Sequence, residues 1–210
     1  MSATRTVVQP ARGSRRLALG ATGVAVLLAL AHTANDAVTA IVAVLLPNLQ
    51  AKFDLSATTL AVLVAGQWAT SSITQPFLGA LADRVSSRAL AAGGIVLNAA
   101  LLSLVGVVPT VPLLFAVIVV GGLGSAALHP VATAIAHHHG GKRAGLGVGL
   151  FSAGGQIGAA LGPAAILAVV ATLGLQGTLW LMVPGLLLGI AVWRLLPPDH
   201  PRGEVAGPRT

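Results

Sequence analysis

Long apolar stretches alternate with short polar breaks along almost the whole chain. A helix of about 20 residues crosses the roughly 30 Å hydrocarbon core of a bilayer, and six stretches reach that length. They cover residues 17–46, 60–81, 89–108, 112–136, 146–173 and 178–196. None shows the alternation of a barrel strand, and an isolated strand leaves its backbone unsatisfied in lipid. The pattern therefore predicts an all-α integral membrane protein with six transmembrane helices over residues 17–196.

Composition supports a membrane protein and narrows the chemistry. Of the 210 residues, 55% are hydrophobic and 8% charged, whereas an average soluble domain carries about a quarter charged residues. Cysteine is absent, which excludes disulfide scaffolds and thiol nucleophiles. The net charge of +7 comes with few aromatic residues and no Tyr, so nucleic acid is not an expected partner. No nucleophile elbow or zinc-protease helix occurs. We expect neither enzyme activity nor a cofactor.

The basic residues lie in alternate breaks. Eleven of the twelve Lys and Arg residues fall in residues 1–16, in the breaks after the second and fourth spans, or from Arg194 onward. The other breaks hold only Lys52. Cytoplasmic loops collect Lys and Arg, so we expect a basic cytoplasmic tail over residues 1–16 and a polar cytoplasmic tail over residues 197–210. The expected location is the plasma or inner membrane, with the lipid bilayer as surroundings.

The start of the chain also fits a second interpretation. Residues 14–16 read Ser-Arg-Arg, an apolar run follows, and residues 29–31 read Ala-Leu-Ala. This order imitates a twin-arginine or ordinary signal peptide with its cleavage site. The apolar run continues to Leu46, however, beyond the 7 to 15 or so residues of a signal h-region. The length favours a transmembrane helix.

A polar stripe interrupts the first span. His32, Asn35, Asp36 and Thr39 follow one another at i, i+3, i+4 and i+7, so they share one helical face. Asp36 is the only acidic residue in any of the six spans. A charge at mid-bilayer costs about 2.5 to 3.5 kcal/mol and usually faces a cavity or a bundle interior. We predict that Asp36 and His32 couple protons and that Asn35 and Thr39 line a substrate pathway. The alternative is an Asp36 that only bonds a neighbouring helix.

Other spans carry polar positions at helical spacing. These are Gln67, Ser71, Thr74 and Gln75 in the second span, Ser125, His129 and Thr133 in the fourth, and Ser152 and Gln156 in the fifth. Ser and Thr commonly serve as packing residues between membrane helices. We therefore assign only Gln67, Gln75, His129 and Gln156 to the pathway. A lone amide or imidazole that is satisfied by a neighbouring helix remains the alternative for them.

Small residues follow a stripe in the fifth span. Gly154, Gly158 and Gly162 lie four residues apart, with Pro163 next. This spacing lets two helices approach closely, so these residues are predicted to form a helix-packing face. The preceding break contains three histidines, residues 137–139. Adjacent histidines on a loop rarely supply a closed coordination shell, and no metal site is predicted.

The break after the second span carries a recognisable motif. Residues 79–88 read GALADRVSSR, which resembles the signature loop between the second and third helices of the major facilitator superfamily. Gly79, Asp83, Arg84 and Arg88 match the signature, whereas Ser86 stands where the family usually has Gly. The resemblance implies a gating role for this loop. GAALGP in the fifth span resembles part of the antiporter signature of drug exporters.

Three longer segments resemble the first half of fosmidomycin-resistance-type exporters. They are residues 32–56, 67–84 and 124–163. The matching motif residues are His32, Asn35, Asp36, Leu46 and Pro47, then Gln75 and Pro76, then His129 and Pro130. This likeness implies proton-driven efflux of small polar or drug-like molecules. Val131 stands where the family tends to place a glutamate, so any proton role carried there is missing.

The family resemblance also predicts an assembly. Major facilitators have twelve spans in two halves related by an axis along the membrane normal, and six spans are equivalent to one half. Two copies would then form a proton-coupled secondary transporter, with the glycine face of one copy against the other. One subunit of a heteromer, or a non-transporting membrane assembly protein, are the alternatives. The substrate is not readable from the residues.

Overall fold

The computed structural model describes residues 19–197, and these are helical, with no strand among them. The α-helices are α1 Ala21–Thr39, α2 Ile41–Val44, α3 Leu46–Phe53, α4 Ala57–Ile73, α5 Gln75–Leu81, α6 Ser87–Ser103, α7 Val111–Gly140, α8 Ala144–Leu173 and α9 Met182–Leu195. Three 3-10 turns join them: η1 Leu104–Gly106, η2 Gly141–Arg143 and η3 Leu175–Leu181. The predicted all-α class is confirmed.

Prolines explain two of the breaks inside the predicted spans. α3 begins after Leu45, two residues before Pro47, and α5 begins after Thr74, two residues before Pro76. Proline has no amide hydrogen and clashes with the carbonyl four residues earlier, so a new helix starts with proline in its first turn. The first predicted span, residues 17–46, contains α1, α2 and the first residue of α3, and the second span corresponds to α4 and α5.

The turn between α7 and α8 differs from the predicted loop. α7 continues through Pro130 to Gly140, so His137, His138 and His139 form its last turn. The prediction that these histidines lie on a loop is wrong. The helix ends at Gly140, and the next residue, Gly141, has a φ of 50°, in the left-handed region that glycine adopts at no steric cost.

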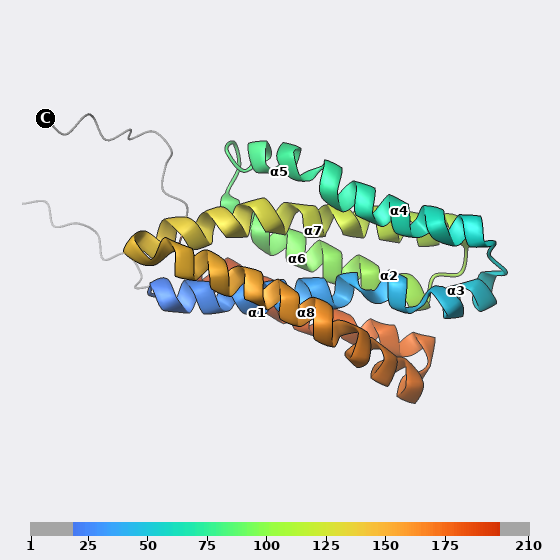
Figure 1. Cartoon of the computed structure of the whole chain (residues 1–210). Coiled ribbons are helices and arrows are strands. Elements are labelled where there is room, and N and C mark those ends of the chain that lie inside the picture. Colours follow the sequence, from blue (N-terminus) through green and yellow to red (C-terminus); the bar gives the residue numbers. More distant parts are fainter. Residues whose placement is uncertain (1–18, 198–210) are drawn as a thin grey trace, which may run out of the picture.

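Four helical stretches in residues 19–197 are long and apolar enough to cross a membrane. They are Ala21–Val44, Ser87–Gly106, Val111–Leu173 and Leu175–Leu195. The third, of 63 residues, contains both α7 and α8, which fold back on each other (Figure 1). α4 and α5, with 17 and 7 residues, fall outside the four. The count of six spans therefore stays a prediction.

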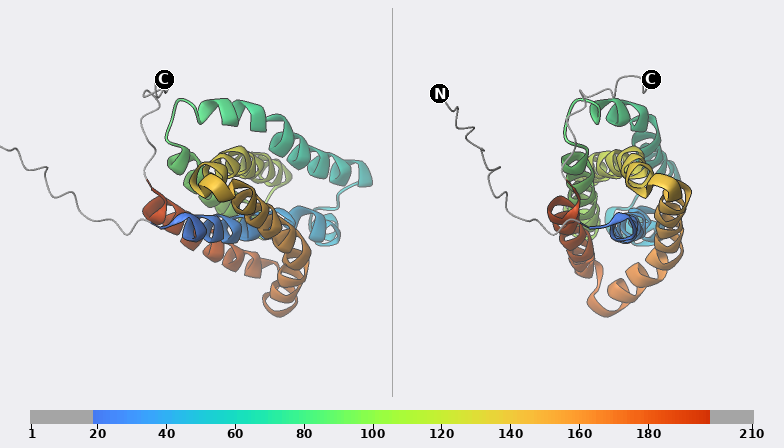
Figure 2. Two further views of the ribbon diagram at one scale, coloured as in Figure 1. Left: turned by 60° about the vertical axis from the view of Figure 1, so that its left-hand side comes forward. Right: turned by 90° about the vertical axis from the view of Figure 1, so that its left-hand side faces the viewer.

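α1 is the central helix of the bundle. It contacts α6, α7, α8 and α9, and in the end-on view it lies between α8 and α9 (Figure 2, right). α4 and α5 pack on α7 (Figure 1). Two apolar cores result: Leu28, Ala31 and Leu128 belong to one, and Val38 and Ile118 to the other. The polar stripe of α1 falls between them.

The basic connections gather at one end of the bundle. The α5–α6 and α7–α8 connections lie at the same end as the start of α1, and the α3–α4 and α6–α7 connections lie at the other (Figure 1). The end of α9 also lies at this end of the bundle, because the Arg88 guanidinium donates to the Leu196 carbonyl at 3.3 Å and lies over the Trp193 ring. The predicted tails, residues 1–16 and nearly all of 197–210, lie outside the described residues.

The glycine stripe of α8 packs on α1 of the same chain. A Cβ at Gly158 would overlap the backbone of Thr33, and the equivalent contacts join Gly154 to Ala29 and Gly162 to Ala37. The Thr33 hydroxyl donates to the Gly154 carbonyl at 2.9 Å across this contact. The glycine stripe thus lies in a close helix contact, and α8 continues through Pro163. The expectation that a second copy covers this face is wrong, because α1 already occupies it.

Candidate functional site

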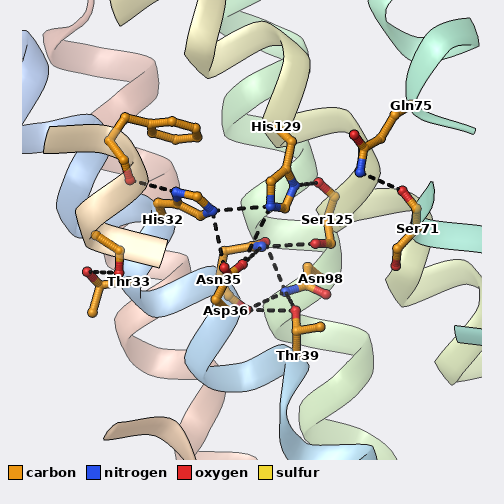
Figure 3. Close-up of polar contacts among 12 residues, drawn as sticks. His32, Thr33, Asn35, Asp36, Thr39, Ser71, Gln75, Asn98, Ser125 and His129 are labelled. Carbon is orange, nitrogen blue, oxygen red and sulfur yellow. Dashed lines mark hydrogen bonds and ion pairs between the residues drawn. The ribbon is translucent and has the colours of Figure 1, made fainter. Parts of the chain in front are cut away.

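A polar layer separates the two apolar cores near the middle of the bundle. α1 and α7 meet there through their polar stripes, and α6 adds one amide (Figure 3). The side chains that hydrogen-bond or pair in this layer are His32, Asn35, Asp36, Thr39, Asn98, Ser125 and His129. The stripes predicted separately on the first and fourth spans thus form one site.

Two imidazoles and one carboxylate meet at the centre of this layer. The Nε2 atom of His32 lies 3.1 Å from Nε2 of His129 and 3.2 Å from Oδ2 of Asp36. The other oxygen of Asp36 is 3.7 Å from Nε2 of His129. We call these three residues the His-Asp-His cluster. One nitrogen or oxygen atom from each lies within 4.8 Å of the others.

Backbone carbonyls hold both rings from the opposite side. Nδ1 of His32 lies 2.7 Å from the Phe151 carbonyl, and Nδ1 of His129 lies 2.7 Å from the Ser125 carbonyl. Because a carbonyl only accepts, each Nδ1 carries a hydrogen, and Nε2 of the neutral ring is an acceptor. Two lone pairs and a carboxylate therefore converge. The cluster is satisfied only when it holds at least one added proton or a cation.

Two asparagines fix the carboxylate. Nδ2 of Asn35 donates to Oδ1 of Asp36 and to the Ser125 hydroxyl, both at 3.0 Å. Nδ2 of Asn98 donates in turn to Oδ1 of Asn35 at 3.0 Å. Asn98 is fully buried, and the sequence analysis missed it. It is the only amide side chain in α6, and an isolated amide in an apolar helix is the signal that could have identified it.

α8 closes one side of the cluster at Gly155. A Cβ at this position would overlap the His32 ring and lie 2.9 Å from Oδ2 of Asp36. The Phe151 ring, one turn earlier, stacks on His32 with centroids 4.1 Å apart. Only glycine at position 155 leaves room for the cluster in its present arrangement.

A hollow of about 320 Å³ borders the cluster. Its size suits a small molecule, since ligand pockets measure about 300 to 1,000 Å³. Asp36 and His129 face it, with side chains 23% and 29% exposed. Trp68 of α4 also lines it and is 69% exposed, so the hollow opens to the surface of the chain.

The predicted pathway residues divide between the hollow, the buried polar layer, where Asn35 lies outside the hollow, and the outer surface. Gln67 and Gln75 line the hollow, as Thr39 does. Their amides donate to backbone carbonyls, that of Gln67 to Thr39 at 3.0 Å and that of Gln75 to Ser71 at 2.9 Å. Gln156 is exposed on α8 and does not line this hollow. Its pathway role stays a prediction.

The residues of the signature loop lie apart from the cluster. Gly79 belongs to α5 and faces Pro130 of α7, since a Cβ there would lie 3.6 Å from the proline ring. Asp83 and Arg84 are exposed in the turn after α5, and Arg88 lies in the first turn of α6. The gating role of this loop stays a prediction.

Comparison with known proteins identifies the family. The sequence matches the profile described as Major Facilitator Superfamily over residues 28–210, most of the chain. The chain belongs to the major facilitator superfamily. Its apolar helices and this membership together make it a multi-pass membrane protein of a transporter family.

Two curated proteins resemble the chain. One is the uncharacterized MFS-type transporter YfnC of Bacillus subtilis (strain 168), 28% identical over 158 residues, which are 74% of this chain and 38% of YfnC. The other is the fosmidomycin resistance protein of Escherichia coli (strain K12), 28% identical over 167 residues, which are 76% of this chain and 39% of that protein. The chain thus spans about two fifths of the length of these relatives.

Proposed function

We propose that this chain forms one six-helix half of a secondary transporter that exports a small polar or drug-like solute against proton entry. The observation that carries the proposal is the His-Asp-His cluster at the wall of the hollow. In this proposal the six spans are α1 with α2, α4 with α5, α6, α7, α8, and η3 with α9. Both ends of the chain then lie on the cytoplasmic side.

The hydrogen-bonding groups of the His-Asp-His cluster support the proton as the coupling ion. Nε2 of His32, Nε2 of His129 and the Asp36 carboxylate have only acceptor lone pairs toward one another when no proton is added. A bound proton turns one of these contacts into a hydrogen bond, and its release restores repulsion. Val131 is buried in an apolar core, so in the described helices the carboxylate available for this exchange is Asp36.

The walls of the hollow support a small polar solute. Gln67, Ser71 and Gln75 provide amide and hydroxyl groups, and Trp68 and Ala43 provide apolar surface. A few polar groups on apolar walls are typical of small-molecule sites. Export, rather than uptake, is taken from the similarity to the fosmidomycin resistance protein of Escherichia coli.

A second copy of the chain is the proposed other half. The hollow opens beside Trp68, and α8 carries exposed Ile157 and Leu161, which need cover from lipid or another helix. In such a dimer Asp83 of one copy would face the start of α8 in the other, where backbone amides favour an anion. Cysteines at Asp83 and Ala144 should then crosslink between copies.

The mass of the complex in nanodiscs separates the alternatives. Two chains without another protein support the homodimer, and recovery only with a different membrane protein identifies a heteromer. Recovery of a single chain that carries no flux would favour the alternative of a non-transporting membrane assembly protein.

Proteoliposome flux under an imposed pH gradient tests the function. The full chain is assayed with phosphonates, sugars and cationic drugs. Asp36→Asn should abolish proton-driven flux and leave the mass of the complex and its helical content unchanged. Asp54→Asn is the matched control, because Asp54 is exposed at the end of α3 in a left-handed conformation that Asn tolerates. Wild-type flux in Asp36→Asn would remove the proposal.

A further inference from the structure

We infer that the His-Asp-His cluster is a binding site for one divalent transition-metal ion of the Zn²⁺ type. The inference goes beyond the proposed transport function and does not rest on it. It concerns what the three side chains bind, whether or not that binding is coupled to solute movement.

The spacing of the donor atoms is close to that of a tetrahedral ion. Zn–N and Zn–O bonds are about 2.0 to 2.2 Å, so two ligand atoms of a tetrahedral site lie roughly 3.3 Å apart. Nε2 of His32 lies 3.1 Å from Nε2 of His129 and 3.2 Å from Oδ2 of Asp36, and Oδ1 of Asp36 lies 3.7 Å from Nε2 of His129. The 3.2 Å and 3.7 Å contacts use different oxygens of Asp36, and one donor atom from each residue lies within 4.8 Å of the other two, so the carboxylate would turn to seat the ion.

The partners around the three ligands are those of a metal site. Histidines that bind metals usually donate their other ring hydrogen to a carbonyl or carboxylate, which fixes the tautomer. Both rings do this here, through the carbonyls of Phe151 and Ser125. Asn35 donates to Oδ1 of Asp36 and leaves Oδ2 free of that bond. The two Nε2 atoms and Oδ2 of Asp36 therefore each keep a lone pair for an ion.

The hollow supplies access and a fourth ligand position. Asp36 and His129 line it, so an ion can arrive from that side and keep a water or a solute atom in the open position, as zinc sites with three protein ligands do. Two imidazoles and one carboxylate suit Zn²⁺, Co²⁺, Ni²⁺ or Fe²⁺. Mg²⁺ and Ca²⁺ prefer oxygen ligands alone, so we expect them not to compete.

The histidines at the end of α7 provide the control. His137 and His138 are exposed, His139 is partly so, and the three follow one another in a single turn. They are not part of a group of three metal-binding side chains in residues 19–197. Replacing all three with Ala should leave high-affinity binding unchanged, whereas the cluster variants should lose it.

Metal titration of the full chain in nanodiscs tests the site, with an affinity tag that contains no histidine. Co²⁺ should give the visible absorption of a tetrahedral complex at one ion per chain, and Zn²⁺ should displace it while millimolar Mg²⁺ does not. Asp36→Asn and His129→Asn should each weaken binding by about 100-fold or more, since loss of an outer-shell partner alone costs about 10- to 100-fold.

A second measurement uses only the wild-type chain, so its result does not depend on whether the variants fold. The X-ray absorption spectrum of the Zn²⁺-loaded wild-type chain should show two imidazole ligands. Absence of stoichiometric binding, or a spectrum without two imidazoles, would overturn the inference and leave the transport proposal standing. Stoichiometric binding without any pH-driven flux would support the metal site and contradict the transport proposal.

Discussion

The Nε2 atoms of His32 and His129 lie 3.1 Å apart, although 97 residues separate them in the chain. The rings are nearly perpendicular, at 86°, and each is tied to a backbone carbonyl through Nδ1. Any hydrogen between the two Nε2 atoms must therefore be an added one. This contact makes α1 and α7 parts of a single site, which also contains Asp36.

His129 should be as necessary for coupling as Asp36. His129→Gln removes a partner of a charged hydrogen-bonded group, worth about 1.5 to 3 kcal/mol, so pH-driven flux in proteoliposomes should fall by about tenfold or more. His137→Gln makes the same exchange at an exposed position of α7 and should behave as wild type. Equal flux in both variants would show that the two rings do not work as one unit.

Gly158 should be essential for the packing of α8 on α1. Gly158→Ala places a methyl group against the backbone of Thr33, and overpacking of this kind costs about 1 to 3 kcal/mol. Thermal unfolding in detergent should therefore shift to lower temperature. Gly149→Ala is the matched control on the same helix, because open space surrounds that position. A variant at 158 as stable as the one at 149 would contradict the contact.

Asn98 should stabilise the polar layer from α6. Asn98→Ala leaves the side-chain oxygen of Asn35 without this donor, and hydrogen bonds between membrane helices are worth about 0.6 to 2 kcal/mol. Thermal unfolding should report a loss of that size, together with weaker flux because the Asn35 bond to Asp36 loosens. Asn48→Ala, at an exposed position of α3, should change neither quantity.

Cysteine scanning should map the hollow, since the chain contains no native cysteine. Ser71→Cys and Gln75→Cys should react with water-soluble thiol reagents and be protected by a transported solute, because both positions line the hollow. Val42→Cys, fully buried, and Leu187→Cys, on the apolar outer surface of α9, should stay unreactive. Labelling of all four at one rate would mean that the hollow is not the water-filled path.

Gln156→Cys tests the predicted pathway residue that lies on the exposed face of α8, outside the hollow. Reaction with the same thiol reagents would place the exposed face of α8 in water, whereas a lack of reaction would place it in lipid or against another helix.

Much of the fold could be predicted because its causes are local. Apolar stretches long enough to cross a bilayer specify helices, and a spacing of three and four residues puts His32, Asn35, Asp36 and Thr39 on one face whatever surrounds the helix. Pro47 and Pro76 lie just after breaks in the predicted spans for an equally local reason. The four-residue spacing of the glycine stripe by itself indicates a close helix contact.

The partners of these faces were decided by the tertiary structure. Periodicity determines which side of a helix a residue occupies but not which helix packs against that side. The partner depends on how all the helices pack around α1. The glycine stripe therefore met α1 of its own chain, not a second copy. Asn98, alone in α6, joined Asn35, and Gln156 fell outside the hollow. The meeting of His32 and His129, with tautomers set by two backbone carbonyls, exists only once α1, α7 and α8 are packed together.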